Sequence, residues 1–600
     1  MSRTATTPRP AASRSTAPSP DEASARPKEG HRETVEALVV AFILALLVRG
    51  FAAEAFVIPT GSMAPTLMGR HKEVTCPECG HVYTVNASEE VEGSTFRQVA
   101  KLSDIRVHTG ICVNCRFQTR VDAEPSFKGD RILVMKFPYD LPFLPGASPP
   151  NRWDVVVFRY PEEPETSYIK RLVGLPGEEL RVWFGDLLIK PPGGDAFRLE
   201  QKPLEHQRAM QMLVYDDTHR AKRLDSPEWR RWSPGSPSAW REESEGAAEK
   251  RRYQYVSTAS PGPEWAELRY RHLVPDPEQW NAILEERTLP RPPRSTLITD
   301  FYSYNTNLTE SSSDLNGTPH YDQKGAWLQP HWVGDLTLAA KLDVGAPGGA
   351  VRFELIEGGV ANRCEIDLTS GMATLSHGDQ VLRQGASGIT GAGTYGVEFA
   401  NVDGRLTVWL DGRPIFGKGV VYEEGSGPHA IPTAADLSPA AIATRGTSAT
   451  VSDLVLKRDI YYTQRPGDPD YDTMWDFRKP NTPVELFNFL SDPAQFEAMG
   501  GLTPSDYPIG PDRYMMMGDN SPRSKDGRGW DTKDRLDPYD PERGWDSSHR
   551  ESWEVPRALI TGKAFFVYWP HGKPFGPDIR LNPDFRLPFR PYVERMKWIR

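Results

Sequence analysis

The residues best suited to chemistry lie in three short segments that are far apart in the chain. The first, residues 56–67, reads FVIPTGSMAPTL and sets Ser62 directly after a glycine, between two prolines. The second, residues 168–178, reads YIKRLVGLPGE, and the third, residues 518–528, reads GDNSPRSKDGR. A serine hydroxyl is a poor nucleophile until a base takes its proton. No Gly-x-Ser-x-Gly elbow occurs in the sequence, so a hydrolase of that kind is not indicated.

An apolar segment runs directly into the serine motif. Residues 1–33 carry mostly small, polar and positively charged side chains, which cannot bury enough apolar surface to fold, so we expect a disordered cytoplasmic tail. Residues 34–56 contain an uninterrupted apolar run and reach the ~20 residues of a membrane span. We predict one transmembrane signal anchor in the cytoplasmic (inner) membrane, because the positive charges before it favour a cytoplasmic N-terminus. Everything after it then lies on the extracytoplasmic face.

Two other interpretations of this apolar segment are a buried core helix and a cleaved signal peptide. The cleaved peptide is disfavoured because the apolar run continues directly into the serine motif.

Taken together, the three segments, in this order and after an apolar segment, resemble type I signal peptidases. These are membrane-bound Ser/Lys proteases that remove leader peptides from secreted preproteins. The resemblance implies that Ser62 is the nucleophile and that Lys170, as a neutral amine, is the general base. An ordinary lysine has a pKa of ~10.4, so burial has to lower the pKa by several units. Lys136 is a rival base, ranked second because it matches a non-catalytic position of the family.

The same resemblance assigns supporting roles around the serine. The Thr60 hydroxyl and the Ser62 backbone N–H would form an oxyanion hole, whose donors are worth ~3 to 4 kcal/mol of barrier. In the third segment Ser524 would hydrogen-bond the lysine, and Asp526 with Arg528 would form an ion pair behind the site. Four apolar side chains would line the pockets that accept Ala-x-Ala-like sites of preprotein signal peptides, with ordinary core packing as the alternative: Phe56, Ile58, Leu67 and Ile169.

Two departures from the family pattern bear on the geometry of the site. Pro522 stands in the middle of the third segment and removes a backbone donor. Trp153 stands where relatives usually have a glycine. For Gly518, Asp519 and Asn520 we expect turn formation rather than direct catalysis.

The resemblance implies a signal-peptidase-type β catalytic domain that is split by two insertions, and the abundant proline and glycine favour turns and short strands, so we expect a mainly β protein. The strands expected in this domain are 129–137, 152–158 and 558–569. The parts of the catalytic domain are residues 57–72, 126–190 and 511–600. The insertions are residues 73–125 and 191–510.

The first insertion contains two Cys-x-x-Cys pairs, which are Cys76 with Cys79 and Cys112 with Cys115. Two such pairs are typical of a four-thiolate zinc ribbon, in which the closed coordination makes the metal structural and not catalytic. Disulfides are the alternative, because thiols outside the membrane oxidise readily. Cys364 stands alone and is expected to be a core residue.

The second insertion shows short alternating strands at regular spacing over residues 296–460, which predicts an antiparallel β-sandwich. The run RLTVWLDG at 405–412 resembles a late hairpin of concanavalin-like or laminin-G-like jelly rolls. Such a domain would bind a glycan or a protein, or serve as a spacer without a ligand.

Charge and composition limit the remaining classes of function. The formal net charge of -10 argues against a nucleic-acid partner. A second hypothesis is a catalytically silent, membrane-anchored scaffold that binds glycans or proteins through the sandwich. A self-cleaving protease of the repressor type is disfavoured because no DNA-binding module is recognisable. The leading hypothesis needs the lipid bilayer and preproteins as partners, and no catalytic cofactor.

Overall fold

The structure, a computed structural model, divides the chain into two units, Met1–Glu54 and Ala55–Arg600, which we treat separately. The residues that it describes are 29–47, 53–90, 106–136, 139, 148–161, 163–235, 240–245, 252–258, 264–311, 320–321, 329–345, 348–389, 391–422, 431–464, 482–496, 504–530, 539–540, 544–545, 553–582 and 585–600.

The first unit contains one described helix, α1 (Glu29–Leu47), of 19 residues. The helix includes the last residues of the segment 1–33, which are therefore helical and not part of a disordered tail; residues 1–28 lie outside the described residues. Among the helices that the structure describes, none is both long enough and apolar enough to span a membrane. The end of the anchor predicted at 34–56 instead forms part of strand β1 (Ala53–Val57).

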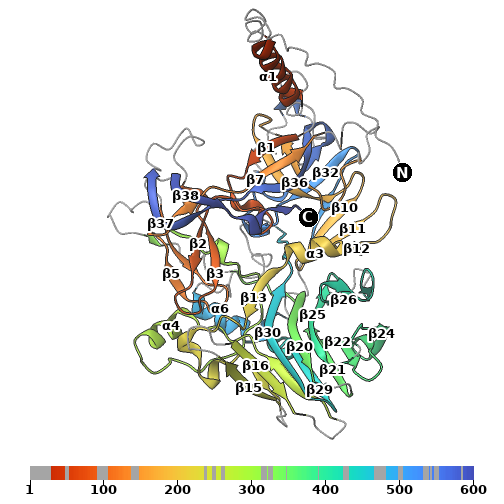
Figure 1. The fold of residues 1–600 in the computed structure, drawn as a ribbon. Helices are drawn as coiled ribbons and strands as arrows, with labels where there is room; N and C mark the ends of the chain where they lie inside the picture. The colour runs from red at the N-terminus through yellow and green to blue at the C-terminus, as the bar shows by residue number, and fades with distance from the viewer. Residues whose placement is uncertain are drawn as a thin grey trace, which may run out of the picture. The chain divides into compact units, whose positions relative to one another are not determined.

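An eight-stranded sheet of order β1-β7-β36-β8-β9-β32-β35, with β39 paired to β36, forms the centre of the catalytic part. The bounds after β1 are β7 Arg131–Met135, β8 Val155–Arg159, β9 Ser167–Gly174, β32 Arg513–Met517, β35 Glu554–Pro556, β36 Ile560–Trp569 and β39 Lys597–Trp598. Strand β7 alternates buried and half-buried residues, as a strand with one face on a core does. The predicted strands at 129–137, 152–158 and 558–569 are β7, β8 and β36, and the mainly β prediction is confirmed. Figure 1 shows that strands from distant parts of the sequence lie side by side here.

A smaller antiparallel sheet of order β12-β11-β10-β31 follows the lysine motif. Its strands are β10 Glu179–Trp183, β11 Asp186–Lys190, β12 Arg198–Leu199 and β31 Ser505–Pro508. Two further pairs of strands lie near the C-terminus: β33 Tyr539–Asp540 with β34 Gly544–Trp545, and β37 Gly572–Asn582 with β38 Phe585–Pro591.

The two Cys-x-x-Cys pairs lie in a set of short hairpins, which we call the cysteine module. Its strands are β2 His71–Thr75, β3 Val82–Asn86, β4 Val107–Ile111, β5 Gln118–Arg120 and β6 Ser126–Phe127. Strand β4 also pairs with β18 (Leu308–Ser311), which comes from the second insertion and pairs in turn with β19 (His320–Tyr321). The two insertions are therefore joined by backbone hydrogen bonds.

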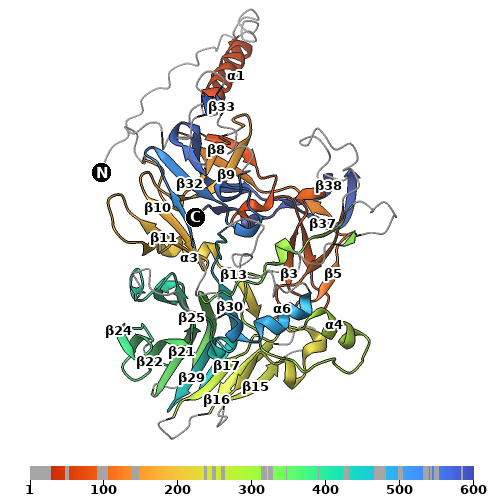
Figure 2. The same cartoon turned by 180° about the vertical axis from the view of Figure 1, so that it is seen from behind.

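The second insertion forms two antiparallel sheets (Figures 1 and 2). One has the order β15-β16-β30-β20-β25-β26-β27, with β13 on β30 and β28 on β26, and the other the order β14-β17-β29-β21-β22-β23-β24. The bounds are β13 Met212–Asp216, β14 Trp232–Pro234, β15 Trp240–Glu245, β16 Arg252–Ser257, β17 Ala266–Tyr270, β20 Leu336–Val344, β21 Ala350–Glu357, β22 Val360–Asp367, β23 Met372–His377, β24 Gln380–Ala386, β25 Gly393–Val402, β26 Arg405–Leu410, β27 Arg413–Pro414, β28 Val420–Val421, β29 Ala440–Arg445 and β30 Ala449–Arg458.

Side chains from both sheets form one shared apolar core, as in a β-sandwich. Cys364 is buried in this core, as expected. The alternation at 296–460 predicted most of these strands, but the sheets also include five strands between Met212 and Tyr270.

Three short helices accompany the sandwich: α3 (Leu204–Met210), α4 (Pro277–Leu284) and α6 (Pro483–Leu490). Helix α4 begins with a capping box in which the Asp276 side chain accepts from Gln279 N. Helix α6 begins at Thr482, whose side chain accepts from Glu485 N.

Candidate active site

The serine motif forms a tight turn directly after β1. Ser62 lies in the 3₁₀ helix η3 (Gly61–Met63), and only 8% of its surface is exposed. The segment around it is held by Asp130, whose backbone accepts from Ile58 N at 2.9 Å and whose carboxylate accepts from Met68 N at 2.8 Å. A Cβ on the neighbouring Gly129 would lie 1.9 Å from Ile58 O, so this close approach requires glycine.

Strand β9 brings Lys170 to the serine. Its Nζ donates to Ser62 Oγ at 2.8 Å and to the Ile169 carbonyl at 3.1 Å, and the residue is 5% exposed. Burial lowers the pKa of Lys170 to about 8; the nearby carboxylates of Asp526 and Asp519 oppose this shift. A lysine with this pKa is partly neutral near pH 7, and its neutral nitrogen can accept a proton from the serine hydroxyl. Lys136, the rival base, lies just after the end of β7.

The third motif is bound to β9 by a buried ion pair that the sequence analysis missed. Arg171 Nε and Nη2 each donate to the Asp519 carboxylate at 2.7 Å, and both side chains are fully buried. Strand β32, which leads into the motif, also pairs Met517 with Arg171. Asp519 therefore does more than form a turn, because it fixes the third motif next to Lys170. Two features of the sequence could have indicated this ion pair. Arg171 directly follows the predicted catalytic lysine, and Asp519 directly follows Gly518 in the third motif.

The predicted pair of Asp526 and Arg528 is present: Arg528 donates to the carboxylate from Nε at 2.9 Å and from Nη2 at 2.7 Å. Burial alone would raise the pKa of Asp526, but the guanidinium outweighs it and holds the pKa below its usual value. The carboxylate also accepts from Gly518 N at 3.0 Å. The pair thus anchors the loop that packs against the serine turn.

Ser524 is buried in this loop, and a Cβ on Gly518 would lie 2.2 Å from its Oγ and 2.4 Å from the Ser62 carbonyl oxygen. The Oγ atom has no hydrogen-bond partner of good geometry among the described residues. The bond to the lysine that the resemblance implies is therefore not formed here; Lys170 donates to Ser62 and Ile169 instead.

The four predicted pocket residues belong to one apolar cluster beside the serine. Ile58 and Leu67 are buried in the cluster, whereas Phe56 and Ile169 pack against it with part of their surface exposed. Thr60 is exposed, and its side chain makes no capping hydrogen bond to η3. The first N–H groups of a helical turn have no acceptor within it, so the Ser62 N–H is suited to bind an anion.

The two departures from the family pattern have simple structural consequences. Pro522 falls in the first turn of the 3₁₀ helix η13 (Ser521–Arg523), where a backbone donor is not needed. Trp153 has φ of 75°, the left-handed region that favours glycine. Its indole ring is buried in an apolar cluster with side chains of β10 and β11. This apolar burial offsets the backbone strain.

The four cysteines of the cysteine module come together, and all are buried and free of disulfides. Cys76 Sγ lies 3.6 Å from Cys115 Sγ, and Cys79 Sγ lies 3.7 Å from Cys112 Sγ. A zinc ion with Zn–S bonds of ~2.3 Å places neighbouring sulfur atoms about 3.8 Å apart, whereas a disulfide needs ~2.05 Å.

The two cysteine loops have the same backbone geometry. In the first, Gly80 N donates to Cys76 O at 2.9 Å, and in the second, Arg116 N donates to Cys112 O at 2.9 Å. Both donors have positive φ, 73° for Gly80 and 62° for Arg116. The donor set and its geometry suit a tetrahedral metal ion better than two disulfides.

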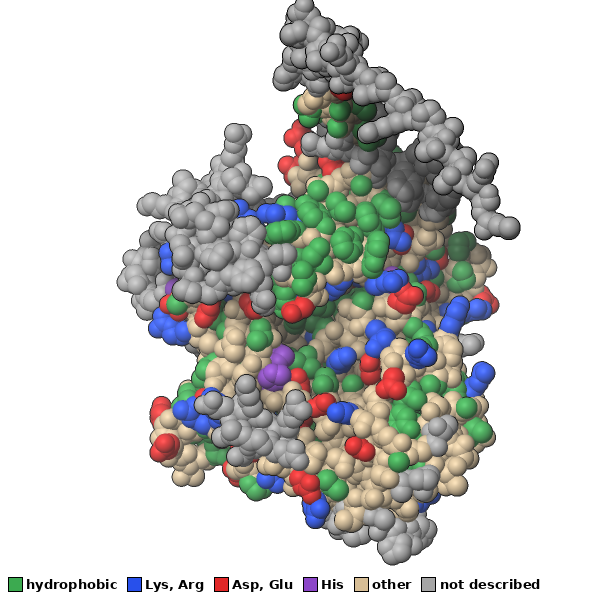
Figure 3. Space-filling view, viewed as in Figure 1, with side chains coloured by type: hydrophobic (Ala, Val, Ile, Leu, Met, Phe, Trp, Pro, Cys, Tyr) green, Lys and Arg blue, Asp and Glu red, His purple; other side chains and the backbone are tan. Residues whose placement is uncertain are grey.

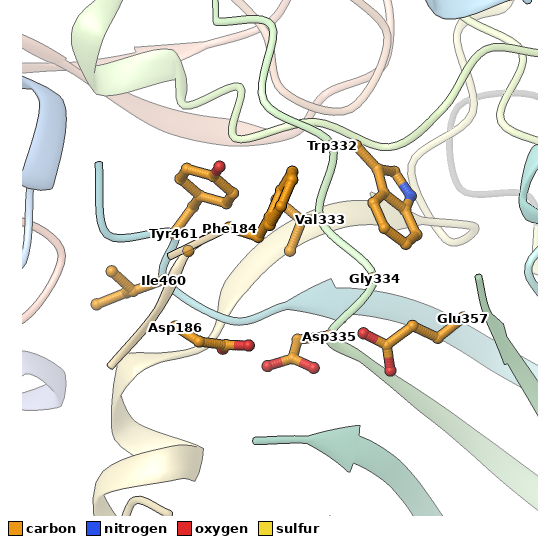
Figure 4. A pocket seen from close by; sticks show the side chains of 10 residues that line it. Phe184, Asp186, Trp332, Val333, Gly334, Asp335, Glu357, Ile460 and Tyr461 are labelled. Carbon is orange, nitrogen blue, oxygen red and sulfur yellow. The ribbon is translucent and has the colours of Figure 1, made fainter. Parts of the chain in front are cut away.

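A second group of polar residues lies where β10 and β11 meet the sandwich (Figure 4). Oxygen atoms of Asp186, Asp335 and Asp403 lie within 4.8 Å of one another, and Lys202 Nζ pairs with Asp403 at 2.6 Å. Burial and repulsion between the carboxylates raise the pKa of Asp186 and Asp335 well above the usual range.

A serine hydroxyl within hydrogen-bond distance of a buried lysine amine, on a β-sheet, is the arrangement that a serine peptidase with a lysine base requires. Residues 110–230 match the family model described as signal peptidase, peptidase S26. Signal peptidase I of Pseudomonas aeruginosa is 54% identical over 59 residues, 9% of this chain and 21% of the relative. Signal peptidase I of Rickettsia bellii is 25% identical over 147 residues, 24% of this chain and 35% of the relative.

These similarities support a serine peptidase of the signal peptidase kind. The chain spans about a fifth of the length of the first curated relatives, at 21%, 21% and 19%. Among solved structures, the carbohydrate-binding module CBM66 from Bacillus subtilis has 10% identity and a TM-score of 0.18, with 37% of this chain and 96% of that one covered. A Bacillus subtilis protein with a galectin-like fold has 8% identity and a TM-score of 0.23, covering 42% and 98%. TM-scores this low permit no inference about the ligands of this chain.

Proposed function

We propose that this chain is a serine endopeptidase that removes N-terminal signal peptides from secreted preproteins after Ala-x-Ala-like sites. Ser62 is the nucleophile and Lys170 the general base. The observation that carries the proposal is the 2.8 Å hydrogen bond between Lys170 Nζ and Ser62 Oγ, made by a lysine whose pKa burial lowers to about 8.

The reaction follows from this pair. Ser62 Oγ attacks the carbonyl carbon of the scissile peptide bond, and its proton passes to the neutral Lys170 amine. The tetrahedral intermediate then breaks its C–N bond, and the lysine returns the proton to the leaving amine, which leaves an acyl ester on Ser62. Water, deprotonated by the same amine, attacks the ester carbonyl; the bond to Ser62 Oγ then breaks, the lysine returns the proton to Oγ, and the signal peptide leaves with a free carboxylate.

The negative oxygen of the tetrahedral intermediate is assigned to the Ser62 N–H and the Thr60 hydroxyl. Thr60 is exposed beside the turn, so its hydroxyl is available to a bound substrate. The partly exposed Phe56 and Ile169 are assigned to the walls of the substrate pockets, whereas the buried Ile58 and Leu67 support them from the core. Ser524 supports the serine turn from the third motif.

We also propose that the enzyme works at the cytoplasmic (inner) membrane, with the catalytic part on the extracytoplasmic face. Figure 3 shows a broad patch of hydrophobic side chains over the region where Figure 1 draws β1, β7 and β36. Val57 on β1 and Trp598 on β39 are large exposed apolar residues of this sheet. An exposed apolar patch of this kind suits contact with lipid or with an apolar signal peptide.

The cysteine module is proposed to hold one structural zinc ion through Cys76, Cys79, Cys112 and Cys115. The support is the match between the observed sulfur separations and those of a tetrahedral tetrathiolate site. Four thiolates fill the coordination shell, so the metal stabilises the module and takes no part in cleavage.

The test is cleavage of a purified preprotein by the full chain in detergent, with product termini located by mass spectrometry. Ser62→Ala and Lys170→Ala are each expected to lose cleavage by ~10³-fold or more, about 4 kcal/mol of barrier, while both variants still fold. A penem that acylates serine should label Ser62 in the wild type only. A silent scaffold that binds partners through the sandwich would show neither cleavage nor labelling, and that result would reject the proposal.

A further inference from the structure

The second insertion reaches the serine turn through one short segment. The 3₁₀ helix η9 (Ser303–Asn305) belongs to this insertion, and all three of its residues are buried. Asn305 Nδ2 donates to Asn520 Oδ1 at 2.7 Å, and Asn520 Nδ2 donates to Asn305 Oδ1 at 2.8 Å. Asn305 is 3% exposed and Asn520 2% exposed. The insertion and the third motif therefore share a reciprocal pair of buried amides.

Asn520 also holds the backbone of the serine turn. Its Nδ2 donates to the Gly61 carbonyl at 3.1 Å, and its backbone N donates to the Ser62 carbonyl at 3.1 Å. The peptide unit between Gly61 and Ser62 is planar and trans, so the Gly61 C=O and the Ser62 N–H point in opposite directions. Fixing the carbonyl on one side therefore aims the N–H on the other side, and this N–H is the proposed oxyanion donor.

The Gly61 carbonyl selects one orientation of the Asn520 side chain, and the amide pair with Asn305 holds the side chain in that place. The two Nδ2 hydrogens of Asn520 serve Gly61 O and Asn305 Oδ1, while its Oδ1 accepts from Asn305. If the Asn520 amide were turned over, its oxygen would face the Gly61 carbonyl oxygen and the bond would become a repulsion. Without Asn305, one Nδ2 hydrogen and the Oδ1 of Asn520 would lose their partners, and only the bond to Gly61 O would hold this side chain.

The segment that carries Asn305 is itself fixed from the other side. Ile111 N, at the end of β4 in the cysteine module, donates to Thr306 Oγ1 at 2.8 Å. Arg458 Nη2, at the end of β30 in the sandwich, donates to the Asp300 carbonyl at 2.6 Å. The Tyr304 ring fills the space next to Gly61, where an added Cβ would lie 2.2 Å from Tyr304 Cε1.

We propose that Asn305 is a positioning residue for cleavage: through Asn520 it aims the Ser62 N–H at the oxygen that becomes negative in the transition state. This inference rests on the proposed peptidase function. A misaimed donor weakens an interaction made only in the transition state, so kcat falls while KM stays the same. The Lys170 amine is not part of this network, so the pH dependence of the reaction is unchanged.

The experiment compares kcat and KM of full-length wild type, Asn305→Ala, Asn520→Ala and the double variant on a peptide with an Ala-x-Ala site. Asn305→Ala is expected to lower kcat about tenfold, the effect of one buried hydrogen bond, with KM and the pH profile unchanged. The double variant should be no slower than Asn520→Ala, because Asn305 acts only through Asn520. Asn362→Ala, which removes an equally buried asparagine of β22, is the matched control and should keep the wild-type kcat.

Every result of this experiment either supports or overturns the positioning role of Asn305. An unchanged kcat for Asn305→Ala, or a further full tenfold loss in the double variant, overturns the positioning role while leaving the peptidase function intact. A rise in KM alone does the same. If Asn305→Ala fails to fold, Asn305→Asp replaces it, because it keeps the shape and the acceptor but removes the donor to Asn520; full kcat in that variant also overturns the role. A wild type that neither cleaves nor is acylated rejects the proposed function and this inference together.

Discussion

The lowered pKa of Lys170 gives the sharpest prediction. Burial brings the pKa from its ordinary value of 10.5 to about 8. At pH 7 about one molecule in ten then carries a neutral amine, against roughly one in several thousand for an exposed lysine. The rate should therefore rise about tenfold per pH unit below the lowered pKa and level off above it.

The same shift has a cost in stability, and its sign can be worked out. The folded state disfavours the protonated amine. Below pH 8 the amine is protonated in both the folded and the unfolded state, so the free energy of unfolding is lowered by the full amount that corresponds to the pKa shift. This loss disappears only as the pH rises through the ordinary pKa of lysine. The shift from 10.5 to about 8 corresponds to about 3 kcal/mol. Lys170→Met removes this penalty and also the two hydrogen bonds of the amine, of about 1 kcal/mol each. We expect the variant to be inactive and about 1 kcal/mol more stable at pH 7.

The assay is kcat/KM from pH 5.5 to 9.5, beside urea unfolding at pH 7, for wild type, Lys170→Met and Lys136→Met. Lys136→Met is the matched control and should keep both the rate and its pH dependence. A rate that still rises steeply above pH 9, as for an unshifted lysine, would contradict the lowered pKa. Cleavage by Lys170→Met at the wild-type rate would contradict the role of Lys170 as base, and a Lys170→Met variant less stable than the wild type would contradict the stability cost of the lowered pKa.

Three further predictions follow from close contacts, the cysteines and the carboxylates. Gly61→Ala should lower kcat at least tenfold because its Cβ would overlap a tyrosine ring at 2.2 Å, whereas Gly345→Ala, with open space around it, should be silent in the same assay. Elemental analysis should find one zinc ion per chain in the wild type. Cys76→Ser should lose this zinc and have a lower melting temperature, whereas Cys364→Ser should keep the metal. Finding the four thiols oxidised would contradict this. Asp335→Asn should raise the melting temperature at pH 8 and have little effect near pH 4, because its raised pKa penalises only the ionised form; an equal effect at both pH values would disprove the cause.

The site residues predicted from the sequence are those whose chemistry is carried by short motifs. Ser62, Lys170 and the pair of Asp526 and Arg528 lie in segments whose residue types are distinctive, and the structure brings these segments together. Alternation predicted β7, whose residues are alternately buried and half-buried, and a short apolar run predicted β8, which is buried over most of its length. The predicted membrane helix is not found among the described helices.

The residues that the sequence did not reveal act across long separations. Asn305 is an ordinary asparagine in its local sequence, and its role depends on a partner 215 residues away. The lack of a side chain at Gly61 makes room for Tyr304, a contact with a residue far away in the sequence. The strands between Met212 and Tyr270 are short and lie before the alternating segment at 296–460, so alternation did not identify them.

The contacts of the third motif argue that the second insertion is part of the catalytic architecture and not a spacer. Near the end of the sandwich, Thr463 N donates to Ser521 Oγ at 2.8 Å, and Arg528 donates to the Thr463 carbonyl. From another segment of the insertion, Asn305 supplies two of the three hydrogen bonds of the Asn520 side-chain amide. Each buried hydrogen bond of this kind contributes ~0.5 to 1.5 kcal/mol. Removing the insertion would take these two bonds from Asn520 and a carbonyl acceptor from Arg528, whose bonds to Asp526 would remain. The loop beside Ser62 therefore depends on the insertion for part of its geometry.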